Sequence, residues 1–204
     1  MELLEPNDII LEKKVLLFDF DGTIANTSKF HESAFNQVLE PYGLKVNYPE
    51  IAGMSTYDAI KKCIFSENKY QYDESWLYEH VIRKQENVRR MISRSLEANP
   101  KISRYIEWAS LRYTLALVTS GSKDTVELAL DKLGLSGYFS VKIFSNDVLR
   151  TKPSPEGFLL ALEKTGFSPS SALVYEDSSS GFKAAINANI DYIDVNKFSW
   201  EILR

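Results

Sequence analysis

The 204-residue sequence predicts an α/β protein in which a five-stranded parallel sheet, flanked by helices, carries an inserted α-helical subdomain. Five short apolar runs end in polar turns, and helical patterns separate the last four of these runs. Strands and helices that alternate in this way form right-handed βαβ units, which place the strands in one parallel sheet. About 80 residues between the first run and the second show no convincing strand, a length that a crossover connection does not need.

The five apolar runs are the predicted strands, because each is short and rich in Val, Ile, Leu and Tyr. They cover residues 15–18, 114–118, 141–144, 172–175 and 190–195. Continuous apolar runs are typical of strands that are buried on both faces of a sheet.

Three helices are predicted between the last four strands, over residues 123–133, 154–164 and 179–188. Gly134, Gly166 and Asn189 lie at or just beyond their ends, and these residue types adopt the left-handed conformation that ends a helix.

The long segment after the first strand is predicted to be helical, over residues 28–40, 55–65, 74–96 and 102–111. Pro41 ends the first of these helices, and Pro100 precedes the last. We interpret residues 27–99 as an inserted helical subdomain, and residues 1–26 and 100–204 as the core domain.

Composition and charge exclude several classes of protein. The formal net charge of −4 argues against a nucleic-acid-binding protein, which needs a basic face. No apolar run reaches the ~20 residues of a membrane span, and residues 1–14 lack the apolar stretch of a secretory signal. Cys63 is the single cysteine, so an intramolecular disulfide is impossible. We expect a cytoplasmic protein that binds neither nucleic acid nor membranes, and a monomer, with a weak dimer as the alternative.

Reactive polar side chains follow four of the predicted strands. Asp19 and Asp21 follow the first strand, Ser120 the second, Lys152 the third, and Glu176 and Asp177 the fourth. Ligands bind at the carboxyl ends of parallel strands, so we expect these side chains to converge if the sheet forms.

These residue types favour phosphoryl transfer. The negative charge of a phosphate monoester repels nucleophiles, and Mg²⁺ together with Lys152 would neutralise that charge. Mg²⁺ prefers hard oxygen ligands, which Asp19 and Asp177 can supply, with Glu176 nearby. The ion would also keep Asp19 ionised for in-line attack, which forms an aspartyl-phosphate. Asp21, two residues further on, would protonate the leaving oxygen and later deprotonate water.

The phosphate itself has a predicted binding group. Ser120 and the backbone amides of Gly121 and Ser122 precede a predicted helix and form an anion-binding concavity. Lys152 would cover the remaining negative charge. Ser120, Gly121 and Lys152 are therefore the predicted phosphate-binding residues.

Four segments resemble, in this order, the signature motifs of the haloacid dehalogenase superfamily. They are DFDGT at 19–23, VTSG at 118–121, TKPSPE at 151–156 and YEDSSSG at 175–181. The resemblance implies a Rossmann-like core with an aspartyl nucleophile at Asp19, an acid–base residue at Asp21, and phosphate contacts from Ser120 and Lys152. It also implies Mg²⁺ held by Asp19, the backbone carbonyl of Asp21, and Asp177. The helical insert corresponds to what that superfamily calls a C1 cap.

Within the superfamily, the sequence resembles the β-phosphoglucomutase-like and phosphoglycolate-phosphatase-like branch. HESAF at 31–35 is similar to its first cap helix, and GMS at 53–55 to its cap loop. By this analogy residues 31–64 face the cleft, which makes His31 and Thr56 candidate substrate contacts. The branch's mutases carry an arginine where this chain has Thr56, and this difference favours a phosphatase.

We predict a Mg²⁺-dependent phosphatase that hydrolyses a small phosphorylated metabolite. A phosphomutase with the same core is the alternative, and a dehalogenase is disfavoured because Asp21 and the acidic pair suit phosphate chemistry. An alternative of another class is a phospho-accepting receiver or binding module, which also uses Asp, Ser or Thr, and Lys on a parallel sheet. The long helical insert argues against it, and Mg²⁺-dependent turnover of an aryl phosphate would distinguish the two.

Overall fold

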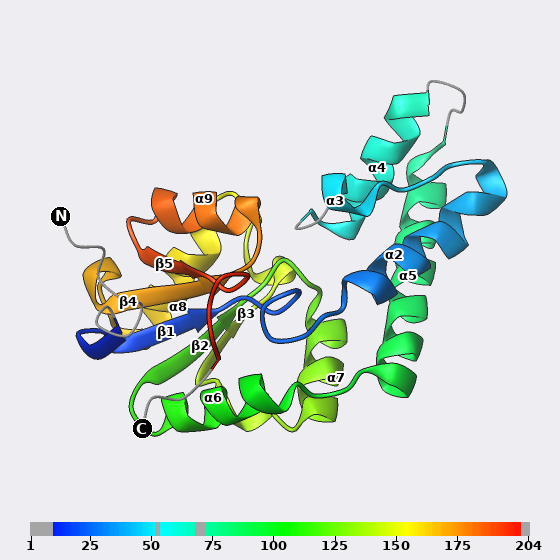
Figure 1. Ribbon diagram of the computed structural model, residues 1–204. Helices are drawn as coiled ribbons and strands as arrows, with labels where there is room; N and C mark the ends of the chain where they lie inside the picture. The colour runs from blue at the N-terminus through cyan, green and yellow to red at the C-terminus, as the bar shows by residue number, and fades with distance from the viewer. Residues whose placement is uncertain (1–9, 52–53, 68–71, 201–204) are drawn as a thin grey trace.

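The computed structural model describes residues 10–51, 54–67 and 72–200, and a five-stranded parallel sheet lies at its centre (Figure 1). The strands are β1 (Val15–Phe18), β2 (Thr114–Val118), β3 (Val141–Ile143), β4 (Ala172–Glu176) and β5 (Asp191–Asp194). Their order is β3-β2-β1-β4-β5, and every neighbouring pair is parallel. The predicted α/β class with a parallel five-stranded sheet is confirmed.

The first strand lies in the middle of the sheet. Val15 of β1 pairs with Thr114 of β2 on one side and with Ala172 of β4 on the other. β2 and β3 therefore lie on one side of β1, and β4 and β5 lie on the other. Because all strands are parallel, their carboxyl ends lie at the same edge of the sheet. Such a switch point between β1 and its neighbours is where open α/β sheets bind ligands.

Helices cover both faces of the sheet, as continuous apolar strands require. They are α6 (Pro100–Ser110) and α7 (Lys123–Leu133) on one face, and α8 (Glu156–Thr165) and α9 (Ser179–Asn187) on the other. Leu16 and Phe18 of β1 pack towards α6 and α7, whereas Val15 and Leu17 pack towards α8 and α9. Both faces of β1 are thus buried, because successive side chains of a strand point to opposite sides.

Between β1 and α6, the described residues form four further α-helices. They are α2 (Ser28–Leu39), α3 (Tyr48–Ile51), α4 (Thr56–Glu67) and α5 (Glu74–Ser95). Phe35, Ile60 and Leu77 from three of these helices share a hydrophobic cluster separate from the sheet. The second half of α5 instead packs on the core, where Val88 and Ile92 join the cluster of α6 and α7. The domain boundaries given above stay a prediction.

Local differences from the predicted elements are small. Helix α3 was not predicted, because four residues are too few to show a helical period. Helix α8 begins at Glu156, two residues later than predicted, with Pro155 as its N-cap. Four 3-10 turns complete the described elements: Glu40–Tyr42, Ser136–Tyr138, Ser145–Asp147 and Pro169–Ser171. Among the described residues, no helix combines the length and the apolar character needed to cross a membrane.

Candidate active site

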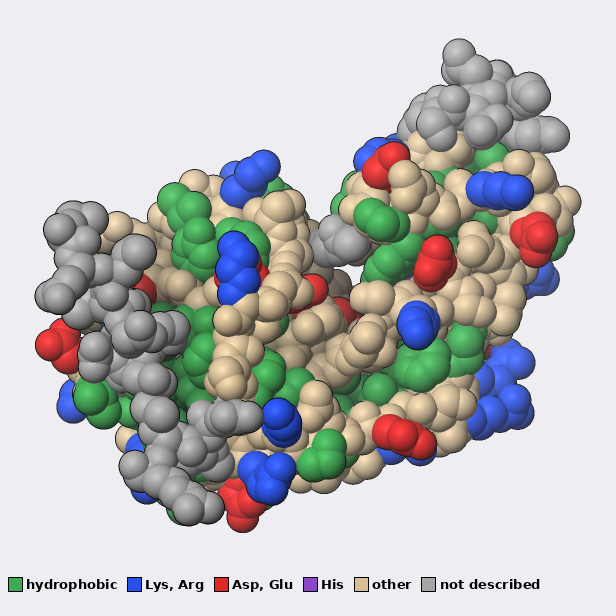
Figure 2. Space-filling model, in the orientation of Figure 1, with side chains coloured by type: hydrophobic (Ala, Val, Ile, Leu, Met, Phe, Trp, Pro, Cys, Tyr) green, Lys and Arg blue, Asp and Glu red, His purple; other side chains and the backbone are tan. Residues whose placement is uncertain are grey.

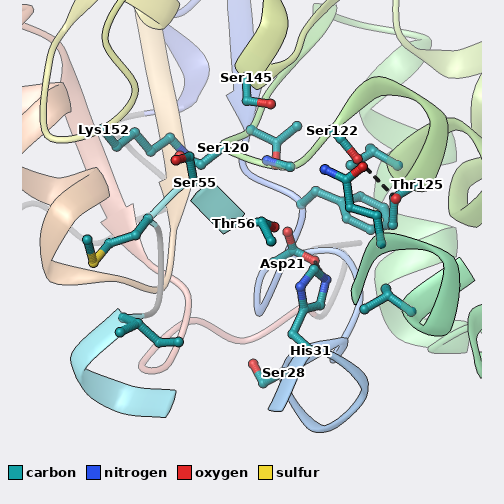
Figure 3. A pocket seen from close by; sticks show the side chains of 18 of the residues that line it. Asp21, Ser28, His31, Ser55, Thr56, Ser120, Ser122, Thr125, Ser145 and Lys152 are labelled. Carbon is teal, nitrogen blue, oxygen red and sulfur yellow. Dashed lines mark hydrogen bonds and ion pairs between the residues drawn. The ribbon is translucent and has the colours of Figure 1, made fainter. Parts of the chain in front are cut away.

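A cavity of about 200 Å³ lies where the carboxyl ends of the strands face helices α2, α4 and α5 (Figure 3). The space-filling view shows the corresponding hollow, with acidic side chains visible in it (Figure 2). The residues that the sequence predicted for the site all line this cavity: Asp19, Asp21, His31, Thr56, Ser120, Gly121, Lys152, Glu176 and Asp177. Their convergence follows from the parallel sheet, and their individual roles stay predictions.

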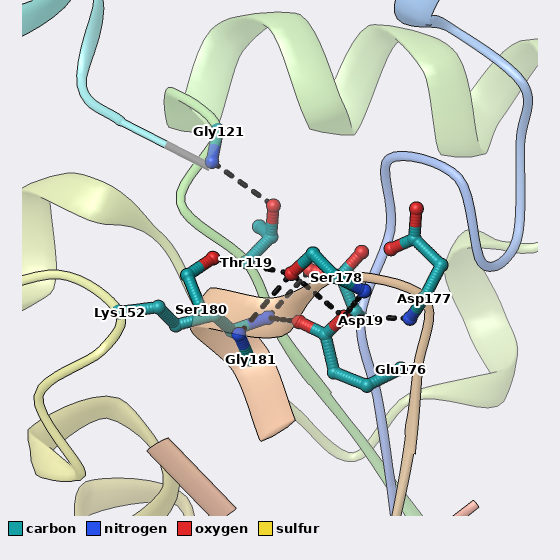
Figure 4. A network of polar contacts seen from close by, with 9 residues as sticks. All are labelled: Asp19, Thr119, Gly121, Lys152, Glu176, Asp177, Ser178, Ser180 and Gly181. Atoms are coloured by element: carbon teal, nitrogen blue, oxygen red, sulfur yellow. Dashed lines mark hydrogen bonds and ion pairs between the residues drawn. The ribbon is translucent and has the colours of Figure 1, made fainter. Parts of the chain in front are cut away.

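A buried lysine bridges two buried carboxylates in this cavity (Figure 4). Nζ of Lys152 donates a hydrogen bond to Oδ1 of Asp19 at 2.5 Å and to Oε1 of Glu176 at 2.7 Å. The three side chains are 6%, 9% and 1% exposed, respectively. Charges at this depth are tolerated only when they are paired and hydrogen-bonded, which is the case here.

Ion pairing and burial shift the pKa values of these three side chains in opposite directions. Burial raises the pKa of Asp19 well above its ordinary range, and the Lys152 ammonium only partly offsets this. Burial would lower the pKa of Lys152, but Asp19 and Glu176 outweigh it and raise that pKa. Burial likewise opposes ionisation of Glu176, yet Lys152 and further hydrogen bonds lower its pKa. The ion pair therefore favours the charged forms of Lys152 and Glu176, whereas burial opposes ionisation of Asp19, and a further cation beside Asp19 would favour its carboxylate form.

The second oxygen of Glu176 holds the turn that follows β4. Oε2 of Glu176 accepts the backbone N–H groups of Asp177 at 2.7 Å and of Ser178 at 2.9 Å. Gly181 lies against the same side chain, since a Cβ there would come within 1.8 Å of Oε1. Both oxygens of Glu176 thus have protein partners, and its predicted role as a metal ligand stays a prediction.

The acidic groups fit a divalent cation. One carboxylate oxygen from each of Asp19, Glu176 and Asp177 lies within 4.8 Å of the others. Burial raises the pKa of Asp177 to about 7, and the neighbouring Glu176 carboxylate adds to the shift. Three acidic groups in so small a volume repel one another, and a hard cation such as Mg²⁺ would relieve that repulsion. The donor set therefore suits the predicted Mg²⁺; the carbonyl of Asp21 as a further ligand stays a prediction.

Gly22 makes room for one of these carboxylates. Its φ of 91° lies in the region that favours glycine. A Cβ at this position would lie 2.0 Å from Oδ2 of Asp177. The glycine after Asp21 therefore allows the loop after β1 to pass directly against Asp177.

The predicted phosphate-binding residues differ in their readiness to bind an anion. The hydroxyl of Ser120 is buried and has no hydrogen-bond partner in the described part of the chain. The backbone N–H of Gly121, in contrast, donates to Oγ1 of Thr119 at 2.9 Å (Figure 4). An anion can therefore accept hydrogen bonds from Ser120 and Lys152 directly. The N–H of Gly121 can donate to an anion only after its hydrogen bond to Thr119 is broken.

Asp21 begins a chain of polar contacts that leads to the helices of residues 27–99. Its Oδ1 accepts a short hydrogen bond from the hydroxyl of Thr27 and lies 3.5 Å from Nε2 of His31. Nδ1 of His31 lies 2.8 Å from Nζ of Lys84, which also donates to Oγ1 of Thr56 at 3.3 Å. These polar contacts connect Asp21, the predicted acid–base residue, with His31 and Thr56, the two predicted cap contacts.

Lys84 is a charged residue of this cavity that sequence reasoning missed. It lies on α5, is 2% exposed, and places its ammonium 4.3 Å from the centre of the Phe35 ring. Burial lowers the pKa of Lys84 to about 7; burial, with Lys84 adding to it, lowers the pKa of His31 to about 4. A signal was present in the sequence, because Lys84 falls on the apolar stripe of α5 between Leu77 and Val88.

Replacing Lys84 by Met is expected to raise the melting temperature, Tm, at neutral pH. The folded-state pKa of Lys84, about 7, lies below its ordinary value of 10.5, so the unfolded chain binds this proton more tightly. The unfavourable contribution of Lys84 to wild-type stability should therefore shrink as the pH increases from about 7 to 10.5, and Met removes this penalty, which is largest at and below pH 7. Calorimetry should show a Tm gain of several degrees at pH 7 that shrinks at pH 10.

Lys123, an exposed lysine at the start of α7, provides the control. Lys123→Met should change Tm little at either pH. An equal Tm gain for Lys84→Met at pH 7 and pH 10 would contradict a buried lysine with a lowered pKa.

Sequence comparisons place the chain among known enzymes. The protein family described as Haloacid dehalogenase-like hydrolase matches residues 16–195. Fructose-1-phosphate phosphatase YqaB of Escherichia coli is 32% identical over 182 residues, which cover 88% of this chain and 95% of that protein. A phosphorylated carbohydrates phosphatase of Thermotoga maritima is 32% identical over 184 residues, 88% of this chain and 83% of that protein.

Solved structures share the fold. The crystal structure of β-phosphoglucomutase from Clostridium difficile superimposes with a TM-score of 0.81 at 22% identity, over 88% of this chain and 83% of that one. At this identity the likeness concerns the fold alone. The matches confirm the predicted superfamily, the Rossmann-like core and the predicted class of enzyme, a phosphoric monoester hydrolase. The chain therefore belongs to the haloacid dehalogenase-like hydrolase family.

Proposed function

We propose that the protein is a Mg²⁺-dependent phosphatase that hydrolyses a small phosphorylated metabolite through an aspartyl-phosphate on Asp19. The observation that carries this proposal is one cavity that combines the Asp19–Lys152 pair, the acidic cluster with Asp177, and the unpartnered hydroxyl of Ser120. A nucleophile, a cation site and an anion-binding group are the parts that transfer of a phosphoryl group requires.

Asp19 and Asp177, with Glu176 beside them, would hold Mg²⁺, which when bound neutralises phosphoryl charge and keeps Asp19 ionised. Lys152 is protonated and lies against Asp19, so it meets a phosphoryl oxygen that approaches this carboxylate. The hydroxyl of Ser120 donates to a second phosphoryl oxygen. These two donors orient the phosphoryl group for attack along the line to its leaving oxygen.

In the first half of the reaction, a carboxylate oxygen of Asp19 forms a bond to phosphorus while the bond from phosphorus to the leaving oxygen breaks. Asp21 gives its proton to the leaving oxygen, so the metabolite departs as an alcohol. Thr27 and His31, which contact Oδ1 of Asp21, orient this carboxyl group.

In the second half, water attacks the phosphorus of the aspartyl-phosphate and the bond from phosphorus to the Asp19 oxygen breaks. Asp21 takes the proton of that water, inorganic phosphate leaves, and Asp19 is a carboxylate again. Helices α2, α4 and α5 line the cavity above the strand ends and reduce the access of other water molecules.

The side of the cavity formed by these helices would select the leaving group. It presents neutral polar side chains, Ser55, Thr56 and Gln85, and one ammonium, Lys84. Two relatives are described as phosphatases of fructose 1-phosphate and of phosphorylated carbohydrates. We therefore propose a phosphorylated sugar, or a polyol of similar size, as the substrate. The cytoplasmic location and the monomeric state stay predictions from the sequence.

Removing Mg²⁺ with a chelator is expected to abolish phosphate release from an aryl phosphate. Asp177→Ala should raise the Mg²⁺ concentration for half-maximal activity at least tenfold, because it removes a ligand, and excess Mg²⁺ should restore part of the activity. The measurement is phosphate release against Mg²⁺ concentration. Asp131→Asn, which changes an exposed carboxylate at the far end of α7, should leave this curve unchanged.

Two outcomes would contradict the proposal. Phosphate release that persists without a divalent cation would overturn the proposed function, and equal curves for wild type and Asp177→Ala would remove Asp177 from the metal site. Product analysis by ³¹P NMR distinguishes a phosphatase from the alternative, a phosphomutase. Inorganic phosphate as the main product supports a phosphatase, whereas an isomeric sugar phosphate supports a mutase.

A further inference from the structure

We infer that Asn196, which follows β5, is a positioning residue that holds Asp177 in the geometry of the metal site. The inference rests on the proposed function, because it concerns the carboxylate that would bind Mg²⁺. Asn196 does not line the cavity and does not touch the reacting groups. It contacts Asp177 through the backbone carbonyl of that residue and not through the carboxylate.

The side-chain amide of Asn196 is aimed at the backbone of Asp177. Nδ2 of Asn196 donates to the carbonyl oxygen of Asp177 at 2.8 Å and to Oδ1 of Asp194 at 2.9 Å. The backbone N–H of Asn196 donates to the same Asp194 oxygen at 3.1 Å. Asp194 therefore orients the amide group, so that one of its hydrogens reaches Asp177.

The parallel pairing of β4 and β5 brings this turn to Asp177. Glu176 pairs with Asp194 in the strand register, and the N–H of Val195 donates to the carbonyl of Glu176 at 2.8 Å. The backbone ladder ends there, so Asp177 is the first residue after β4 that the sheet no longer holds. Asn196 supplies the next contact by a side chain instead.

Asp177 is thereby held at both of its peptide groups. Its N–H donates to Oε2 of Glu176 at 2.7 Å, and its carbonyl accepts from Asn196. Together the two hydrogen bonds restrict rotation of the backbone on either side of the Asp177 Cα, which sets the direction of its Cα–Cβ bond. The carboxylate has little freedom to compensate, because it lies directly against Gly22 and within 4.8 Å of the Asp19 and Glu176 oxygens. Loss of the Asn196 bond should therefore move a metal ligand without removing it.

Asn187 offers a matched control. It is the last residue of α9, and its Nδ2 donates to the carbonyl of Pro153 at 3.2 Å. Asn187 and Asn196 are both exposed asparagines that hold the backbone of a loop at the site. The loop held by Asn187 carries Lys152, which pairs with the carboxylates, whereas the loop held by Asn196 carries Asp177.

The test measures Mn²⁺ binding without substrate, by electron paramagnetic resonance, in wild type, Asn196→Ala, Asn196→Leu and Asn187→Ala. Both Asn196 variants should bind Mn²⁺ roughly 3- to 10-fold more weakly, the effect of losing one contact to the residue that carries a metal ligand. Asn187→Ala should stay within about twofold of wild type. The Mg²⁺ concentration for half-maximal phosphate release should shift by the same factor as Mn²⁺ affinity, while kcat at saturating Mg²⁺ changes by less than about twofold.

Other outcomes of the Mn²⁺ measurements would contradict either the role of Asn196 or the proposed function. Wild-type Mn²⁺ affinity in both Asn196 variants would show that the turn does not position Asp177, even if their Tm fell. An equal loss of affinity in Asn187→Ala would show a general loosening of the site. Failure of the proposed function looks different, because wild type itself would then release phosphate without Mg²⁺ or Asp177→Ala would bind Mn²⁺ as wild type does.

Discussion

Replacing Asp19 by Asn is expected to lower kcat by about four to six powers of ten while the protein stays folded. Asn has nearly the same shape, and its side-chain oxygen can still accept the hydrogen bond from Lys152. Its neutral amide, however, does not form a bond to phosphorus as a carboxylate does. Lys152 keeps its second partner, Glu176, so no buried charge is left unpaired.

Phosphate release and thermal unfolding, measured on the same preparation, test this expectation. Rapid quenching with ³²P-labelled substrate adds a direct test, because wild type should retain label on the protein and Asp19→Asn should not. Asp131→Asn makes the same chemical change at an exposed position and should keep wild-type turnover. Turnover of Asp19→Asn within tenfold of wild type would contradict an aspartyl-phosphate on Asp19.

Replacing Lys152 by Met should have the second largest effect, on activity and stability together. The change leaves Asp19 and Glu176 buried without their shared cation, which costs about 3–5 kcal/mol of unfolding free energy. Turnover should fall by at least about a thousandfold, because the charge that faces the phosphoryl group is lost. Urea unfolding and phosphate release measure the two effects.

The loss of stability in Lys152→Met should depend on pH in a defined direction. In wild type the pKa of Glu176 is lowered, so its contribution to stability is present above its unfolded pKa and is lost as the pH falls through the folded value. Without Lys152, burial raises that pKa instead, and the variant is penalised most at high pH. The destabilisation should therefore be larger at pH 8 than at pH 5.

A double variant separates stability from catalysis. Adding Glu176→Gln to Lys152→Met removes one unpaired carboxylate, so part of the lost stability should return while activity stays low. A destabilisation by Lys152→Met of less than about 1 kcal/mol, or one that grows towards pH 5, would contradict the buried pairing seen here.

Much of this fold could be predicted from the sequence, because its elements depend on short segments. The strand ends differ from their predicted positions by no more than one residue, since each strand is an apolar run that stops at polar turn residues. The convergence of the polar residues at those ends could be predicted as well, whereas their roles stay predictions. Once the strands are parallel, their carboxyl ends meet at one edge, and Asp19 comes to lie beside Lys152 although 133 residues separate them.

The partners of the site residues depended on the tertiary structure. Lys84 reaches His31 across 53 residues because α5 packs against α2 in one particular rotation, which no local pattern specifies. The N–H of Gly121 is occupied by Thr119, and both oxygens of Glu176 are occupied, which residue types alone do not show.

Asn196 is the clearest example of a contact that could not be predicted from the sequence. It is an exposed residue outside every motif, and it contacts Asp177 only because β5 pairs with β4 in the observed register. Short apolar runs and turn residues encode which chemical groups stand at the strand ends, because that information is local. Hydrogen-bond partners between distant segments are set by the packing of whole helices and strands, and only the folded chain decides them.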